Sequence, residues 1–246
     1  MNYTTSLKQV LIIPTLMFLL LTSTSYAQHQ TYSLKKYTEK ELSSKSVEEL
    51  ALLRNEILAR KGYVFSKGIY ADYFDLQDWY KPIQSNTTIV LTENENVQID
   101  LIKKIENQKK VIRTKALSDL KELKKVVNSN NKTLFDKLVP TKEKDVNLMD
   151  GIKDVLNTCN IDGINWTQKE GLYKVTIDNG DAISIYYIKF TNTEVILSGG
   201  RIKHSEIHGD FNDGYSGYHS EDEYVEWFYF KLTEQGLKFD RWNIAG

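Results

Sequence analysis

Apolar residues recur at helical spacing through much of the first half of the chain. Ser46 and Glu49 have the spacing of a capping box, in which each side chain satisfies a free amide at the start of a helix. The apolar residues that follow share one helical face, and Gly62 is the kind of residue that ends a helix in the left-handed conformation. We therefore predict a helix from Ser46 to Arg60, followed by a short helix near residues 70–74.

A second capping box, at Thr92 and Glu95, begins a much longer helical pattern. Lysine and arginine fill most faces of this pattern, and the predicted apolar stripe consists of Val97, Leu101, Ile105, Ile112, Ala116, Leu120, Leu123 and Val127. Two short helices are expected after it, at 134–139 and 148–156, on either side of Pro140.

Beyond residue 160 the apolar pattern changes to alternation, which is typical of strands. Strands are predicted at 173–177, 183–190, 194–197, 201–208, 224–232 and 237–244. Asn179 and Gly180 form a strong tight-turn signal between the first two of these strands. We predict an α+β fold, with a small N-terminal all-α domain, a long connecting helix and a C-terminal antiparallel β-sheet packed on short helices.

Residues 1–27 have the features of a secretion signal. An apolar run at 10–21 is too short for the roughly 20 residues that cross a bilayer, and Ser25 and Ala27 are small residues placed for cleavage before Gln28. A lipid anchor would need a cysteine at that position. We expect an exported protein, periplasmic or secreted, that is soluble and has no stable membrane anchor after cleavage; an uncleaved anchor is the alternative.

The patterns divide the remaining chain into four parts. These are a flexible polar leader at 28–44, a helical domain at 45–107, a helical connector with short helices at 108–160 and an antiparallel sheet domain at 161–246. A single cysteine cannot form an internal disulfide, so Cys159 is expected to be a small buried residue at a helix end.

Charge gives little indication of a partner. The formal net charge of −1 predicts affinity for neither nucleic acid nor an anionic surface. Residues 100–137 carry 11 Lys or Arg against 5 Asp or Glu, but aromatic residues for base stacking are not interleaved with them. We interpret this stretch as solvated helix surface rather than a polyanion site, and we expect no nucleic-acid partner.

Seven aromatic residues lie within the 18 residues from Tyr63 to Tyr80, which indicates a compact aromatic core for a small domain. With the helix before them, they make residues 45–107 resemble the YARHG domain, a small domain of exported bacterial proteins. The resemblance rests on Arg54-Asn55-Glu56-Ile57, Ala59-Arg60-Lys61-Gly62, Tyr73-Phe74 and Trp79-Tyr80-Lys81-Pro82. The pentapeptide that names the family is here Leu58-Ala59-Arg60-Lys61-Gly62, so the tyrosine and histidine of the family are absent.

The resemblance implies export and a fold more than a chemistry. It carries over four polar residues as candidates for ligand binding, Arg54, Asn55, Glu56 and Arg60. Glu56 and Arg60 are also four residues apart on the predicted helix, so an ion pair that stabilises the helix explains them equally well.

One candidate metal site lies in the second half of the chain. His204, Glu206 and His208 alternate on a predicted strand and would project from the same face. Two imidazoles and a carboxylate can hold Zn²⁺ with one position open for water. An exposed polar strand face explains the same three residues. No other cofactor is predicted.

These observations favour a non-enzymatic protein that binds a protein or a glycan in the cell envelope or outside the cell. The alternative is an envelope hydrolase, with a metal site at His204, Glu206 and His208 and a substrate loop at 210–223. Neither a nucleophile elbow, nor a P-loop, nor a dinucleotide fingerprint occurs in the sequence.

Overall fold

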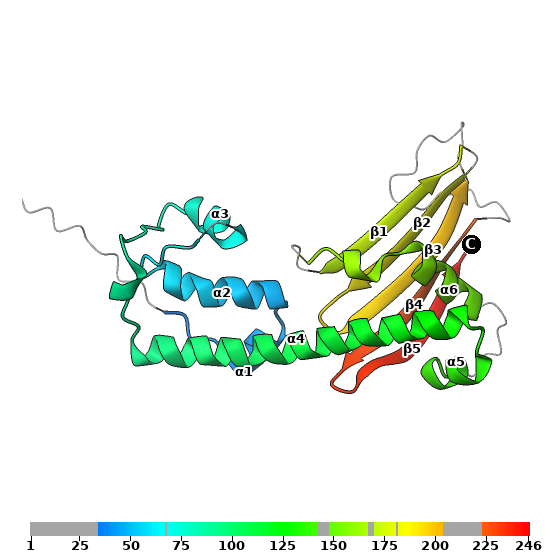
Figure 1. Ribbon diagram of the computed structural model, residues 1–246, viewed down its shortest axis with the longest axis horizontal. Helices are drawn as coiled ribbons and strands as arrows, with labels where there is room; N and C mark the ends of the chain where they lie inside the picture. The colour runs from blue at the N-terminus through cyan, green and yellow to red at the C-terminus, as the bar shows by residue number, and fades with distance from the viewer. Residues whose placement is uncertain (1–33, 67, 142–147, 167–169, 181, 204–222) are drawn as a thin grey trace, which may run out of the picture. The chain divides into compact units, whose positions relative to one another are not determined.

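The computed structural model of the protein describes residues 34–66, 68–141, 148–166, 170–180, 182–203 and 223–246 (Figure 1). The contacts of Leu34–Gly246 make this stretch one unit. Within the described residues, no helix is long and apolar enough to cross a membrane.

Capped helices form the first part of this unit. They are α1 (Glu39–Ser43), α2 (Val47–Ala59), α3 (Ile69–Asp75), the short 3-10 helix η1 (Asn86–Thr88) and the 36-residue α4 (Glu93–Asn128). The capping boxes expected at Ser46 and Thr92 are both present. Gly62 has a φ of 80°, and its amide closes the end of α2 on the carbonyl of Ala59. The predicted helices are thereby confirmed.

Helix α1 lies where the sequence predicted a flexible leader. Thr38 and Glu41 form a capping box of the same kind as the other two, which stabilises the start of this short helix. Leu42 is fully buried in a cluster with Leu50 of α2 and Ile102 of α4. One apolar side chain thus anchors a segment whose composition is otherwise polar.

The buried stripe of α4 differs from the predicted one at its start. Val97 is 57% exposed, whereas Ile99 and Ile102 are buried. Each step of four residues turns about 40° beyond a full helical turn, so the predicted steps from Val97 to Ile105 drift around the helix. From Ile105 onward the predicted positions are buried or half-buried, and Leu120 is fully buried.

The second part contains α5 (Lys132–Leu138), α6 (Leu148–Thr158), the 3-10 helix η2 (Ile161–Gly163) and a five-stranded sheet. The strands are β1 (Gly171–Asp178), β2 (Ala182–Phe190), β3 (Glu194–Lys203), β4 (Tyr224–Thr233) and β5 (Gly236–Ala245). They pair antiparallel in chain order, so the sheet is a meander. The predicted α+β fold, with an antiparallel sheet, is confirmed.

The predicted strands at 194–197 and 201–208 are corrected by the structure. Residues Glu194 to Lys203 form one continuous strand, and 204–208 lie outside the described residues. The pair Gly199 and Gly200, which lies between the two predicted strands, is inside β3. A Cβ at Gly199 would stand 3.0 Å from Val155 of α6 and 3.1 Å from the ring of Tyr186, so glycine allows α6 to pack closely.

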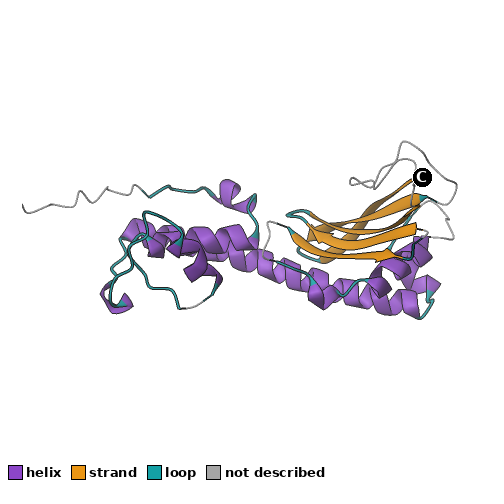
Figure 2. Cartoon of the chain, turned by 90° about the horizontal axis from the view of Figure 1, so that it is seen from above, coloured by secondary structure: helices purple, strands orange, loops and turns teal. Residues whose placement is uncertain are grey.

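Helices α4 and α6 cover one face of the sheet (Figure 2). The core between these helices and the sheet includes Leu120, Ile152, Ile188, Leu197 and Phe228, all fully buried. Cys159 is buried in the same core directly after α6, as predicted. The same long helix therefore supports the N-terminal helices with its first half and the sheet with its second half.

Candidate functional site

One of the polar residues suggested by the family resemblance, Arg54, holds α2 and α4 together. Arg54 donates to Glu106 of α4 over 3.0 Å and to the side chain of its neighbour Asn55 over 3.1 Å. Glu106 is only 3% exposed and also receives a 2.6 Å hydrogen bond from Lys110. Burial alone would raise the pKa of Glu106, but the hydrogen bonds from Lys110 and Arg54 outweigh it and hold that pKa below its ordinary value.

Glu56 and Arg60 form the expected ion pair along α2, with 2.7 Å between the carboxylate and the guanidinium. The guanidinium of Arg60 also lies over the ring of Trp79, 3.9 Å from its centre. Trp79 packs in turn on Phe74, the fully buried centre of the predicted aromatic core. These contacts tie α2 to the aromatic segment. The ligand-binding role suggested for the four polar residues stays a prediction.

The predicted metal residues His204, Glu206 and His208 lie outside the described residues. Within the part of the chain that the structure describes, no group of three His, Cys, Asp or Glu side chains could hold a metal ion.

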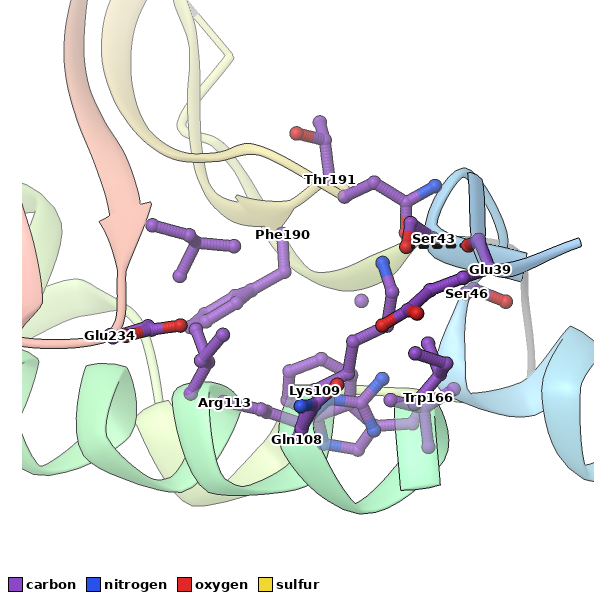
Figure 3. Close-up of a pocket in the computed structure, with 16 residues that line it drawn as sticks. Glu39, Ser43, Ser46, Gln108, Lys109, Arg113, Trp166, Phe190, Thr191 and Glu234 are labelled. Atoms are coloured by element: carbon purple, nitrogen blue, oxygen red, sulfur yellow. Dashed lines mark hydrogen bonds between the residues drawn. The ribbon is translucent and has the colours of Figure 1, made fainter. Parts of the chain in front are cut away.

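A pocket of about 410 Å³ lies between α4, the link from α1 to α2, and the end of the sheet that carries the β2–β3 turn (Figure 3). Its apolar walls are Ile105 and Ile112 of α4, Trp166, Phe190 of β2 and Leu232 of β4. Its polar lining comes from Glu39, Ser43, Ser46, Gln108, Lys109, Arg113, Thr191, Asn192 and Glu234. The pocket therefore combines an apolar interior with charges of both signs.

Arg113 forms a fixed wall of the pocket. It binds both carboxylate oxygens of Glu48, at 2.8 and 3.0 Å, and lies over the ring of Trp166, 3.8 Å from its centre. Trp166 packs edge-on against Phe190. A bidentate ion pair and a stacked ring restrain the guanidinium strongly. Arg113 thus links the start of α2, through Trp166, to Phe190 at the end of β2.

Most other polar groups of the pocket are also occupied. Asn192, in the β2–β3 turn, donates to the carbonyl of Ser44 over 2.8 Å. Ser46 accepts the capping bond of α2, and Glu39 pairs with Lys104 at 3.3 Å. Thr191 accepts from the amide of Glu194 within its turn. These groups shape the pocket and have little capacity left for a ligand.

Lys109 is the exception. It is half-buried, and no hydrogen bond or ion pair involves it among the described residues. Burial lowers the pKa of its amine, the nearby charge of Arg113 lowers it further, and the carboxylate of Glu49 acts in the opposite direction without restoring it. Gln108 and Glu234 also lack a partner within the described part of the chain, but both are exposed. Lys109 is the cation that a ligand entering the pocket would meet.

No pattern in the sequence indicates this pocket. We interpreted the lysines of 100–137 as a solvated surface, and Lys109 looks like any other of them in the sequence. Its surroundings come from Trp166, Phe190 and Asn192, which are more than fifty residues away in the chain and meet it only in the fold. The sequence indicated only that the long helix would connect the helical domain to the sheet domain.

Comparison with known proteins identifies the first part of the chain. A family model described as "YARHG domain" matches residues 25–107. This segment is a YARHG domain. No curated protein and no solved structure matched the chain.

The matched range, residues 25–107, includes α1. Lys61 stands where the naming pentapeptide of the family has histidine, and it binds Glu95 at the start of α4 over 3.0 Å. The YARHG domain supplies Glu39, Ser43, Ser46, Val47 and Ile105 to the pocket. Lys109 and Arg113 follow within two turns of its end, and the sheet supplies the opposite wall.

Proposed function

We propose that this YARHG-domain protein is an exported binding protein whose pocket holds a small ligand with a carboxylate next to an apolar group. The observation that carries the proposal is Lys109, a half-buried cation without a partner among the described residues. A charge that is partly removed from water without a partner is costly, and an anionic ligand group would remove that cost.

The rest of the pocket supports the same class of ligand. A volume of about 410 Å³ lies within the range usual for small-molecule sites, which have mostly apolar walls and few free polar groups. Trp166 and Phe190 offer apolar surface in the pocket that Lys109 also lines. A peptide C terminus and an acidic sugar both carry such a carboxylate, which agrees with the protein or glycan partner expected from the sequence.

Binding is favoured over catalysis by the chemistry of the lining. The described lining residues contain neither histidine nor cysteine, and Ser43, Ser46 and Thr191 are held by hydrogen bonds within their own turns and helix ends. Hydrolysis by a nucleophile would need a base in contact with it. We propose no cofactor for this pocket.

Export is supported by the signal-like residues 1–27 and by the YARHG domain that follows. The test is the mass of the protein recovered from the periplasm or medium of the cell that makes it. A chain that begins at Gln28 is expected. A full-length chain retained in the cytoplasm would contradict export. It would not contradict ligand binding in the pocket, which the binding test below measures separately.

The binding test uses N-acetyl-phenylalanine and its amide, which differ mainly in the carboxylate charge, and glucuronate as an acidic sugar. At about 0.3 kcal/mol per heavy atom, N-acetyl-phenylalanine should bind with a Kd of roughly 1 mM, measurable by NMR titration. The amide should bind at least about tenfold more weakly. Tighter binding of glucuronate than of N-acetyl-phenylalanine would identify the acidic-sugar source.

Two substitutions on α4 locate the effect. Lys109→Met should abolish the preference for the carboxylate over the amide, whereas Lys103→Met, at an exposed lysine of the same helix, should preserve it. Equal binding of acid and amide to the unmodified protein, or an unchanged preference in Lys109→Met, would show that Lys109 does not recognise a carboxylate.

A further inference from the structure

The sheet has a second face, which none of the described core clusters reaches. Along each strand, residues that alternate with the core positions point to this side. We call it the outer face. Its apolar residues are all half-buried, and they are Leu172, Ile183, Ile185, Tyr187, Ile196, Ile202, Val225, Trp227, Tyr229 and Ala245. None of these side chains belongs to the core that α4 and α6 form on the other face.

The centre of the outer face is ordered by one aromatic contact. Ser198 on β3 pairs with Tyr187 on one side and with Trp227 on the other, and the indole of Trp227 donates to the hydroxyl of Tyr187 over 3.0 Å. The two large side chains meet above Ser198, which explains its burial to 1% exposure. The outer face therefore presents a rigid aromatic centre.

Polar residues surround this centre at both edges of the sheet. On β1 the polar positions that face the same side are Lys174, Thr176 and Asp178, and on β5 they include Arg241 and Asn243. Arg241 lies over the ring of Tyr229, 3.7 Å from its centre. An aromatic and aliphatic centre within a charged rim is the composition of protein interfaces rather than of ordinary surface.

We infer that the outer face is the contact surface of a dimer, with a second copy of this chain as its partner. Five strands about 4.8 Å apart, each paired over at least eight residues at about 3.3 Å per residue, form a face of about 24 by 26 Å, or about 600 Å². Two such faces bury about 1,200 Å², the lower limit for a specific interface.

The same dimensions argue for a sheet as the partner. A helix is about 10 Å wide and would cover about two of the five strands, leaving much of the apolar centre in water. An identical sheet covers it completely, as in a β-sandwich with its two sheets about 10 Å apart. In a two-fold dimer, Trp227 and Tyr229 of one copy meet the apolar centre of the other, so one surface serves both partners.

Sedimentation equilibrium of the chain from Gln28, between 1 and 100 µM, tests this dimer. We expect a concentration-dependent dimer in the unmodified protein. Ile185→Lys places a charge at the centre of the outer face, twice in each dimer, and should weaken association at least about 100-fold. Ile244→Lys is the matched control, because Ile244 is 56% exposed on the opposite face of the same sheet. It should leave the dimer intact.

Circular dichroism shows whether each variant is folded. If Ile185→Lys unfolds, Ile185→Gln serves instead and should weaken association about tenfold. A protein that remains monomeric at 100 µM would overturn the inference, because the outer face would then be open or covered by another part of the same chain. A dimer that the Ile185 variant and the Ile244 variant form equally well would also overturn it, because the contact would lie elsewhere.

Discussion

Glu106 allows a direct test of whether the polar residues shared with the YARHG family have a structural role. Its carboxylate is almost fully buried and accepts hydrogen bonds from Arg54 at 3.0 Å and Lys110 at 2.6 Å. Replacing it by glutamine preserves the shape and one acceptor oxygen but removes the charge. Arg54, whose side chain is 23% exposed, then keeps its charge without a full counter-charge.

The expected cost follows from these contacts. A hydrogen bond to a charged group contributes about 1.5 to 3 kcal/mol, and loss of one partner from a buried pair costs about 3 to 5 kcal/mol. Lys110 is half-exposed, so its share is small. We therefore expect Glu106→Gln to lower the free energy of unfolding by about 2 kcal/mol, and Glu106→Ala by about 3 to 4 kcal/mol.

Urea unfolding followed by circular dichroism measures this difference. Glu122→Gln is the control, since Glu122 lies on the same helix and pairs with Lys125 at 3.4 Å in an exposed position. That substitution should change stability by at most about 0.5 kcal/mol. If Glu106→Gln costs no more than Glu122→Gln, the Arg54–Glu106 pair does not hold α2 on α4, and the reasoning is wrong.

Three further predictions follow from the same structure. Glu95 and Glu106 both have a pKa below the ordinary 4.5. The stability that they contribute is therefore present above pH 4.5 and is lost as the pH falls below it. In an acid titration, Glu106→Gln should lose less folding stability than the unmodified protein. Burial raises the pKa of Cys159 to about 11, so a thiol reagent at pH 8 should react only after unfolding in urea, and fast reaction of the native protein would contradict its burial. Gly62→Ala should lower the free energy of unfolding by more than about 1 kcal/mol, because φ is 80° and a Cβ would stand 2.7 Å from the carbonyl oxygen of Lys81. Gly68→Ala is the control for crowding, because a Cβ there would meet no atom within 4 Å. Thermal or urea unfolding measures both.

The elements of this fold were predictable where local signals are strong. Capping boxes at Ser46 and Thr92 placed the starts of two helices, and alternation with the Asn179-Gly180 turn placed the first hairpin. Errors arose where tertiary contacts decide. Leu42 makes α1 a buried element, and the side chains of Tyr186 and Val155 lie close to Gly199 inside β3, where glycine leaves them room.

The pocket could not be predicted from the sequence, because it too depends on tertiary contacts. A lysine on a charged helix is usually solvated, and nothing adjacent to Lys109 in the chain distinguishes it from Lys103. What distinguishes it is Trp166 and Phe190, brought beside α4 by the sheet. Long-range packing, which no local pattern records, half-buries Lys109 where no partner lies among the described residues.

The most direct test of the proposed function is the pKa of the Lys109 amine, followed by NMR with isotope-labelled lysine in the absence and presence of N-acetyl-phenylalanine. In the free protein the pKa should lie below the ordinary 10.5, because burial and Arg113 both disfavour the charged form. A carboxylate bound next to the amine favours the charged form, so the probe should raise this pKa, and the amide of the probe should not. A Lys109 pKa that is the same with and without saturating carboxylate would contradict the account.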